Sequence, residues 1–140
     1  MERSAIFNCL NDGFMPICTG GGGIPVVKSD RGYMGVDAVI DKDLASSLLA
    51  RILEVDKFVI LTDVKGVYRN YGGSNEEFIP DISALDLEGE LQSGIFPKGS
   101  MGPKVRAALE FAKVTGKQAV IGSLDEAGMV IDGKAGTIIH

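Results

Sequence analysis

The chain has 140 residues, a length typical of one domain, with a formal net charge of −5 and 24% charged residues. It has no stripe rich in Lys and Arg and no run of 18 apolar residues, which argues against a nucleic-acid partner, a membrane-surface module and a transmembrane helix. The first residues show no signal-peptide pattern. The two cysteines, Cys9 and Cys18, form neither a disulfide framework nor a CxxC site, so we expect reduced thiols in a cytoplasmic protein.

The composition also limits the available chemistry. The single histidine is His140, which argues against a His-based metal site and a Ser/His/Asp triad. Glycine accounts for 19 of the 140 residues. This share is near twice the usual ~7%, and we expect the glycines in turns and ligand loops. Any catalysis would then depend on lysines, carboxylates and backbone amides, with no metal-binding cluster.

The first part of the chain predicts two helices and two strands. Residues 4–10 predict a helix, and the apolar run 14–19 predicts a short buried strand before four glycines. Residues 44–53 place apolar side chains on one face, which predicts an amphipathic helix that starts near Asp41 and Asp43. Residues 58–62 are rich in β-branched and large apolar side chains and predict a second strand.

The second part predicts a loop over residues 63–75, then a modest helix over 85–91. A glycine-rich connection follows, and a longer helix begins near Pro103 and buries Val105, Ala108, Leu109 and Ala112. Residues 119–122 and 136–139 predict strands, and between them a capping-box pattern that starts at Ser123 predicts a short helix. The order α-β-α-β-α-α-β-α-β predicts an α/β fold in which helices sandwich a mostly parallel or mixed sheet.

Four segments could carry chemistry, and each has a structural alternative. Gly20–Gly23 could cradle an anion or form a tight turn, although no Walker A or dinucleotide pattern surrounds them. The sequence Asp41-Lys42-Asp43 could orient and neutralise phosphoryl charge, or only stabilise a helix end.

The other two segments follow a strand and open a helix. Thr62 and Asp63 could bind a ligand at the strand end, and Tyr68 could stack on a base or pack in the core. The turn at residues 99–104 is suited to phosphate at a helix N-terminus. Lys104 lies in the first turn of that helix, where a positive charge interacts unfavourably with the helix dipole. This suggests either an anion near the lysine or a lysine that is solvated.

Together these segments resemble the carbamate kinases of the amino acid kinase superfamily, over nearly the whole chain. The four-glycine and Ile-Asp-Lys-Asp elements are the most specific. The matching segments are Thr-Gly-Gly-Gly-Gly-Ile-Pro-Val-Val (19–27), Ala-Val-Ile-Asp-Lys-Asp-Leu-Ala-Ser (38–46), Ile-Leu-Thr-Asp-Val (60–64), Tyr68 with Asn70-Tyr71-Gly72, and Gly-Ser-Met-Gly-Pro-Lys (99–104).

The resemblance implies a kinase that transfers phosphoryl between carbamoyl phosphate and ADP, giving ATP and carbamate, with Mg²⁺ and a role in arginine metabolism. It implies that Asp43 orients lysines, that Lys104 stabilises the transferred phosphoryl group and that Lys42 adds charge. Gly20, Gly21, Gly22 and Gly23 would face carbamoyl phosphate. The implied nucleotide-binding residues are Thr62, Asp63, Val64, Tyr68, Ser100, Met101, Gly102 and Pro103.

The resemblance is to the C-terminal half of these kinases only. Residues 1–140 would form one nucleotide-binding lobe, without the family's N-terminal acceptor lobe. We therefore expect exposed apolar surface, association as a homodimer or with the missing lobe, and little activity of the chain alone. Two alternatives stay open: a non-catalytic ADP/ATP-binding remnant or regulatory module, and a related amino acid kinase with another acceptor.

Overall fold

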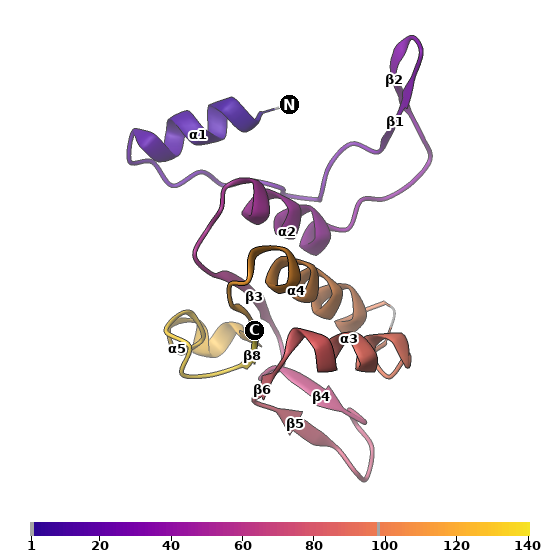
Figure 1. Ribbon diagram of the computed structural model, residues 1–140, viewed down its shortest axis with the longest axis vertical. Coiled ribbons are helices and arrows are strands. Elements are labelled where there is room, and N and C mark those ends of the chain that lie inside the picture. Colours follow the sequence, from indigo (N-terminus) through magenta and orange to yellow (C-terminus); the bar gives the residue numbers. More distant parts are fainter. Residues whose placement is uncertain (1, 98) are drawn as a thin grey trace.

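A computed structural model describes residues 2–97 and 99–140 (Figure 1). No helix within these residues is long and apolar enough to cross a membrane. In chain order the elements are α1 (Arg3–Asn11), β1 (Val26–Ser29), β2 (Gly32–Gly35), α2 (Lys42–Ile52), β3 (Phe58–Thr62), β4 (Val67–Arg69), β5 (Glu77–Ile79), β6 (Asp81–Ile82), α3 (Ala84–Gln92), α4 (Met101–Thr115), β7 (Ala119–Ser123), the 3₁₀ turn η1 (Leu124–Glu126), α5 (Ala127–Ile131) and β8 (Thr137–Ile139).

The central sheet has the strand order β3-β7-β8-β6. β3 pairs with β7 in parallel, from Phe58 opposite Ala119 to Thr62 opposite Ser123. β8 is antiparallel to β7 and parallel to β6. The sheet is mixed, with two of its three pairings parallel, and this confirms the predicted α/β class.

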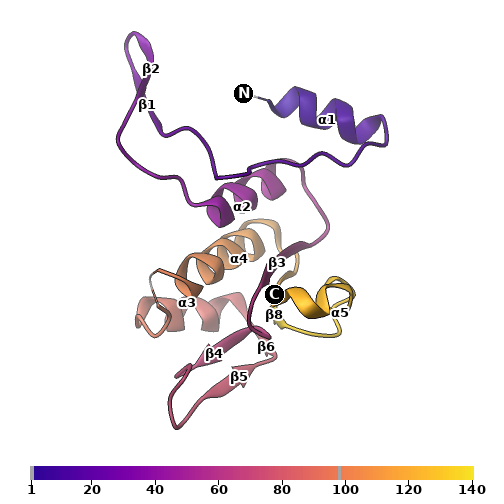
Figure 2. The ribbon, with the colours of Figure 1, turned by 180° about the vertical axis from the view of Figure 1, so that it is seen from behind.

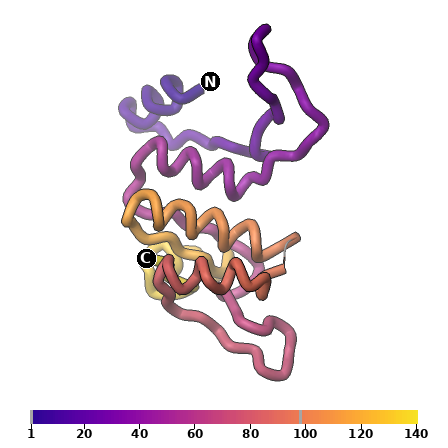
Figure 3. The backbone as a smooth tube through the Cα atoms, turned by 45° about the vertical axis from the view of Figure 1, so that its right-hand side comes forward, coloured from indigo at the N-terminus to yellow at the C-terminus, as the bar shows by residue number. Residues whose placement is uncertain are grey.

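Helices cover both faces of this sheet. On one face α4 lies between α2 and α3 (Figure 3), and Phe111 of α4 packs on Phe58 of β3 with ring centroids 5.4 Å apart. α5 covers the other face. Its Val130 packs so closely on Gly122 of β7 that a Cβ on Gly122 would lie 2.5 Å from a methyl group of the valine. Burying a phenylalanine or valine contributes about 1.5–3 kcal/mol each, so both layers stabilise the sheet.

Side-chain caps explain where the predicted helices α2 and α3 begin. Asp41 accepts hydrogen bonds from the backbone N–H groups of Asp43 and Leu44, and Ser83 accepts one from Asp86. At its C-terminus, α4 is ended by Gly116, which adopts a left-handed conformation with a φ of 66°. The predicted capping residue Ser123 accepts from the N–H of Asp125, although this starts the turn η1 rather than α5.

The strand predicted at residues 14–19 is wrong. Phe14 and Met15 are exposed, Ile17 is fully exposed, and no strand within the described residues pairs with this segment. A lone strand leaves its backbone groups unpaired, so an apolar run needs a neighbouring edge to become one. The segment instead runs along α2 and joins α1 to the exposed hairpin β1–β2, both away from the sheet (Figures 1 and 2).

The loop predicted at residues 63–75 was also incomplete. The hairpin β4–β5 lies partly within it, and the two-residue strand β6 follows. Such short strands carry too few residues for a periodic pattern. Thr137 of β8 fixes the hairpin, because its buried hydroxyl accepts from Val67 N–H at 2.8 Å and donates to the Ile79 carbonyl at 2.5 Å.

Candidate functional site

A cavity of about 330 Å³ opens beyond the carboxyl end of β3. This is the position where open α/β sheets bind ligands, and the volume is at the lower end of the usual range for small-molecule sites, about 300–1,000 Å³. Its lining residues are Thr62, Asp63, Val64, Gly66, Tyr68, Asn70, Tyr71, Ile95, Phe96, Pro97, Ser100, Met101 and Lys104.

One wall of the cavity comes from the end of β3 and from the β4–β5 hairpin. Thr62 donates its hydroxyl to the Asp63 carboxylate at 3.0 Å. Tyr68 contacts two other aromatic rings, with centroids 5.6 Å from Tyr71 and 5.3 Å from Phe78. Burial, together with Glu76 and Tyr71 nearby, raises the pKa of Tyr68, so its phenol keeps its proton at neutral pH.

The opposite wall comes from the connection after α3 and from the first turn of α4. The N–H of Gly102 donates to the Pro97 carbonyl at 2.8 Å, and a Cβ on Gly102 would lie 2.9 Å from that oxygen. Only glycine therefore fits this approach without a shift of the backbone. Within the described chain no side chain caps the first turn of α4. The N–H groups of Ser100 and Gly102 both donate to the Pro97 carbonyl, and Pro103 has no N–H, so the backbone at this turn is largely paired already.

Lys104, which lines this cavity, pairs with Asp43, which does not line it. The Lys104 ammonium donates to the Asp43 carboxylate at 3.0 Å, and the two side chains are only 18% and 14% exposed. Asp43 comes from the first turn of α2 and Lys104 from α4, 61 residues further on. The anion that the position of Lys104 suggested is thus Asp43, and the fold pairs two residues that the sequence had assigned to one site.

The glycine run lies near the start of α2 but does not line this cavity. The carbonyl of Ile40, one residue before the helix cap, lies where a Cβ on Gly22 would stand, and Gly22 has a φ of 108°. Beside it, Thr19 and Ser46 share a hydrogen bond of 2.9 Å. Gly20, Gly21 and Gly23 are exposed, as is Lys42, so this end of α2 is open to solvent.

Two further predicted residues lie outside the cavity. Gly102 and Pro103 line a separate groove between α3 and α4, together with Asp41. Seven of the predicted site residues line the cavity itself: Thr62, Asp63, Val64, Tyr68, Ser100, Met101 and Lys104.

Sequence reasoning missed six lining residues. Asn70 and Tyr71 belong to a resembling segment, and a tyrosine three residues after Tyr68 was a signal that could have been used. Ile95, Phe96 and Pro97 lie in an irregular connection, where no periodic pattern points to a wall. No sequence pattern pointed to Gly66. A glycine is needed at this position because of a tertiary contact: a Cβ on residue 66 would lie 2.6 Å from the Thr137 hydroxyl.

Comparison with known proteins assigns the chain and its fold to a family. The amino acid kinase family matches residues 1–123, and the chain belongs to this family. It is 48% identical to the carbamate kinase of Thermoplasma volcanium over 139 residues, which are 99% of this chain and 46% of that protein.

Solved structures agree with this assignment. The carbamate kinase from Giardia lamblia bound to AMP-PNP has a TM-score of 0.93 and 45% identity, over 99% of this chain and 49% of that one. An isopentenyl phosphate kinase from T. acidophilum, at 17% identity and a TM-score of 0.66, shares the fold alone. The chain spans about half the length of the carbamate kinases that it matches.

Proposed function

We propose that this chain is the nucleotide-binding half of a carbamate kinase. The observation that carries the proposal is the Asp43–Lys104 ion pair, whose lysine lines the same cavity as Thr62, Asp63 and Tyr68. The similarity to carbamate kinases, one of them bound to an ATP analogue, supports the same reading. The domain would be a single lobe over residues 1–140.

The reaction would move one phosphoryl group between carbamoyl phosphate and ADP. The bond from phosphorus to the carbamoyl oxygen breaks and a bond to the β-phosphate oxygen of ADP forms, giving carbamate and ATP. Such a transfer depends mainly on positioning and charge stabilisation. Lys104 would stabilise charge on the transferred group, Asp43 would hold Lys104 in place by the hydrogen bond described above, and Lys42 would add positive charge.

The cavity lining offers groups for both parts of a nucleotide. Ser100 and Met101, in the turn that opens α4, would bind the phosphates together with the Lys104 ammonium. Tyr68 lies in the opposite wall, where its ring would contact the base. Val64 would line the same site, and Gly102 and Pro103 would shape the turn that carries Ser100 and Met101.

The donor set also fits Mg²⁺ that arrives with the nucleotide. Mg²⁺ usually keeps several waters and binds one or two carboxylates together with substrate phosphates. Within the described residues no group of three His, Cys, Asp or Glu side chains could hold a metal ion by itself. Asp63, the carboxylate in the cavity lining, would contribute to holding it. The ion would supply neutralisation of phosphate charge.

The acceptor side is where this half is incomplete. Gly20, Gly21, Gly22 and Gly23, at the exposed end of α2, would face carbamoyl phosphate. The remaining contacts would come from a polypeptide that corresponds to the other half of the relatives' length. Association with that half, or as a homodimer, is part of this proposal, and so are the cytoplasmic location and the role in arginine metabolism.

Complementation tests this proposal. The chain alone, with carbamoyl phosphate and Mg-ADP, is expected to form little or no ATP. Adding the N-terminal half of the Thermoplasma volcanium enzyme should restore ATP formation. Nucleotide binding without restored transfer would favour a binding or regulatory module, and restored transfer only with another phosphorylated donor would favour a sister kinase. Efficient ATP formation by the chain alone would refute the requirement for the other half.

A further inference from the structure

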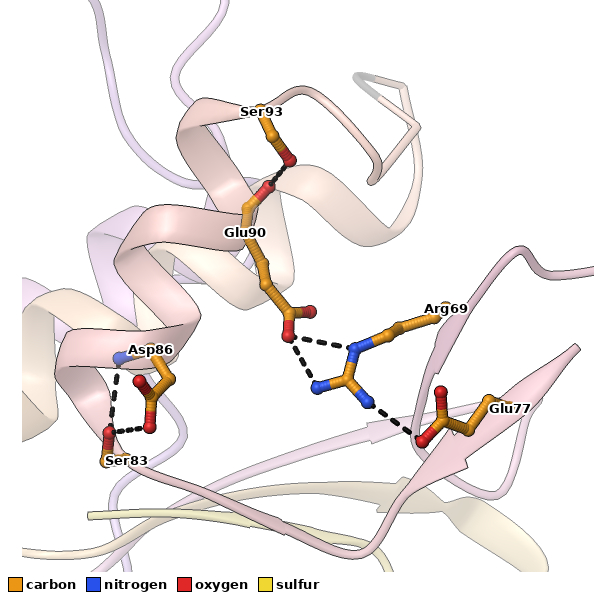
Figure 4. A network of polar contacts seen from close by, with 6 residues as sticks. All are labelled: Arg69, Glu77, Ser83, Asp86, Glu90 and Ser93. Atoms are coloured by element: carbon orange, nitrogen blue, oxygen red, sulfur yellow. Dashed lines mark hydrogen bonds and ion pairs between the residues drawn. The ribbon is translucent and has the colours of Figure 1, made fainter.

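Arg69 of β4 connects the β4–β5 hairpin to α3 by hydrogen bonds (Figure 4). Its Nε donates to Glu90 Oε1 at 2.9 Å, and its Nη2 donates to the same oxygen. Its third contact, from Nη1 to Glu77 Oε1 at 3.0 Å, stays within the hairpin. One guanidinium thus connects β4 to its own partner strand and to a helix 21 residues further along the chain.

Arg69 lies directly behind a cavity residue. Successive side chains of a strand point to opposite faces, so Tyr68 faces the cavity while Arg69 faces away from it. The pairing of β4 with β5 places Tyr68 opposite Phe78 and Arg69 opposite Glu77. Any shift of Arg69 relative to α3 would therefore move Tyr68 as well.

Glu90 lies directly before the opposite wall of the cavity. It belongs to the last turn of α3, and its carbonyl accepts from the Ser93 hydroxyl at 2.7 Å. The chain then continues into Ile95, Phe96 and Pro97, which line the cavity across from the hairpin. The Arg69–Glu90 pair consequently connects the two walls from behind.

The contact with Glu90 is more protected than the contact with Glu77. The Glu90 side chain is 21% exposed and the Glu77 side chain 63%. Glu90 Oε2 is buried and makes no hydrogen bond within the described residues. Without Arg69 the Glu90 carboxylate would lose the hydrogen bonds that its other oxygen makes, which is costly for a charge so little exposed.

We propose that Arg69 is a positioning residue that, through Glu90, fixes the separation of the two cavity walls and so sets affinity for the nucleoside part of the nucleotide. This rests on the proposed function, because it assumes that the cavity holds the base between Tyr68 and the connection after α3. The phosphates, bound at Lys104 and the start of α4, depend on other contacts.

Two ligands separate this role from a general loss of structure. Mg-ADP reports on the whole site, and Mg-pyrophosphate reports on the phosphate end alone. Arg69→Gln and Glu90→Gln should each weaken Mg-ADP binding roughly tenfold and change pyrophosphate binding less than twofold. Because both changes weaken the same Arg69–Glu90 connection, the double variant should bind Mg-ADP no more weakly than the more strongly affected single variant. Glu77→Gln, which removes only the contact within the hairpin, is the matched control and should bind like the wild type.

Wild-type affinity for Mg-ADP in both single variants would overturn the proposal, and so would an equal loss of Mg-ADP and pyrophosphate. Amide hydrogen exchange of the ligand-free protein tests the connection even where no nucleotide binds. Amides of residues 67–79 should exchange faster in the near-isosteric Glu90→Gln variant, and amides of α4 should not. Unchanged exchange in the hairpin would reject the positioning role. A wild type that binds neither ligand, with the exchange result as expected, would instead reject the proposed nucleotide function.

Discussion

Single residues hold the site together by buried hydrogen bonds. Thr137 is fully buried, and its hydroxyl satisfies one backbone group from each strand of the β4–β5 hairpin. A buried backbone group without a partner costs about 1–3 kcal/mol. The position of Tyr68 in the cavity wall therefore depends on a side chain from the last strand of the sheet.

Replacing this hydroxyl by a methyl group tests that dependence. Thr137→Val should lower the free energy of unfolding by about 2 kcal/mol, because the Val67 N–H and the Ile79 carbonyl both lose their partner. Thr137→Ser keeps the hydroxyl and should lose less. Urea unfolding measures both variants, and equal stability of the valine and serine variants would contradict this role.

Among the secondary-structure elements, α2 brings Asp43 to the site. Asp41 caps its first turn, with its carboxylate 2.8 Å from the Asp43 N–H. Asp41→Ala should therefore cost about 1 kcal/mol of stability, and Asp41→Asn, which keeps a capping oxygen, much less. Thermal unfolding compares the two variants. An alanine variant as stable as the asparagine variant would show that the cap contributes nothing.

The elements also show what the sequence could predict. α2, α4, β3 and β7 follow from periodic or continuous apolar patterns, because each buries a face against a neighbour within the chain. The run at residues 14–19 has the same local pattern but no edge to pair with. Strand formation depends on that partner, which the local sequence does not contain.

The same limit applies to the candidate site. Glycine and polar residues at element ends pointed to Thr62, Asp63 and Ser100. The ion pair between Lys104 and Asp43 joins positions 61 residues apart, and its proximity depends on how α2 packs against α4. The resemblance to a family anticipated it, whereas no spacing in the chain did.

The whole molecule has an exposed N-terminal part, from α1 to the start of α2, and a packed remainder. α1 contains no buried residue among those described, and apolar side chains from its C-terminal end to the start of α2 are exposed. They include Leu10, Phe14, Met15, Ile17, Ile24, Tyr33, Met34 and Val39. Large exposed apolar areas mark interaction surfaces. Because the chain spans 46% of a related carbamate kinase, we propose that the other half of the kinase fold covers this surface.

In the absence of that half, the surface should drive self-association. Light scattering after size-exclusion chromatography should show concentration-dependent oligomers of the wild type. The double variant Met15→Ser/Ile17→Ser should shift these oligomers toward the monomer. Val114→Ser, which changes an exposed apolar residue of α4 outside this surface, is the control and should behave like the wild type. A wild type that stays monomeric at all concentrations would contradict the prediction.

The central claim is that nucleotide phosphates bind where α4 begins, beside Lys104. Calorimetric titration of the folded protein with Mg-ADP tests it most directly, with Lys104→Ala and the matched variant Lys113→Ala, whose exposed lysine on the same helix pairs with Glu88. We predict that the wild type and Lys113→Ala bind alike. Lys104→Ala should bind at least about tenfold more weakly, because hydrogen bonds to charged groups contribute about 1.5–3 kcal/mol. Equal binding by Lys104→Ala, or no binding by the folded wild type, would contradict the claim.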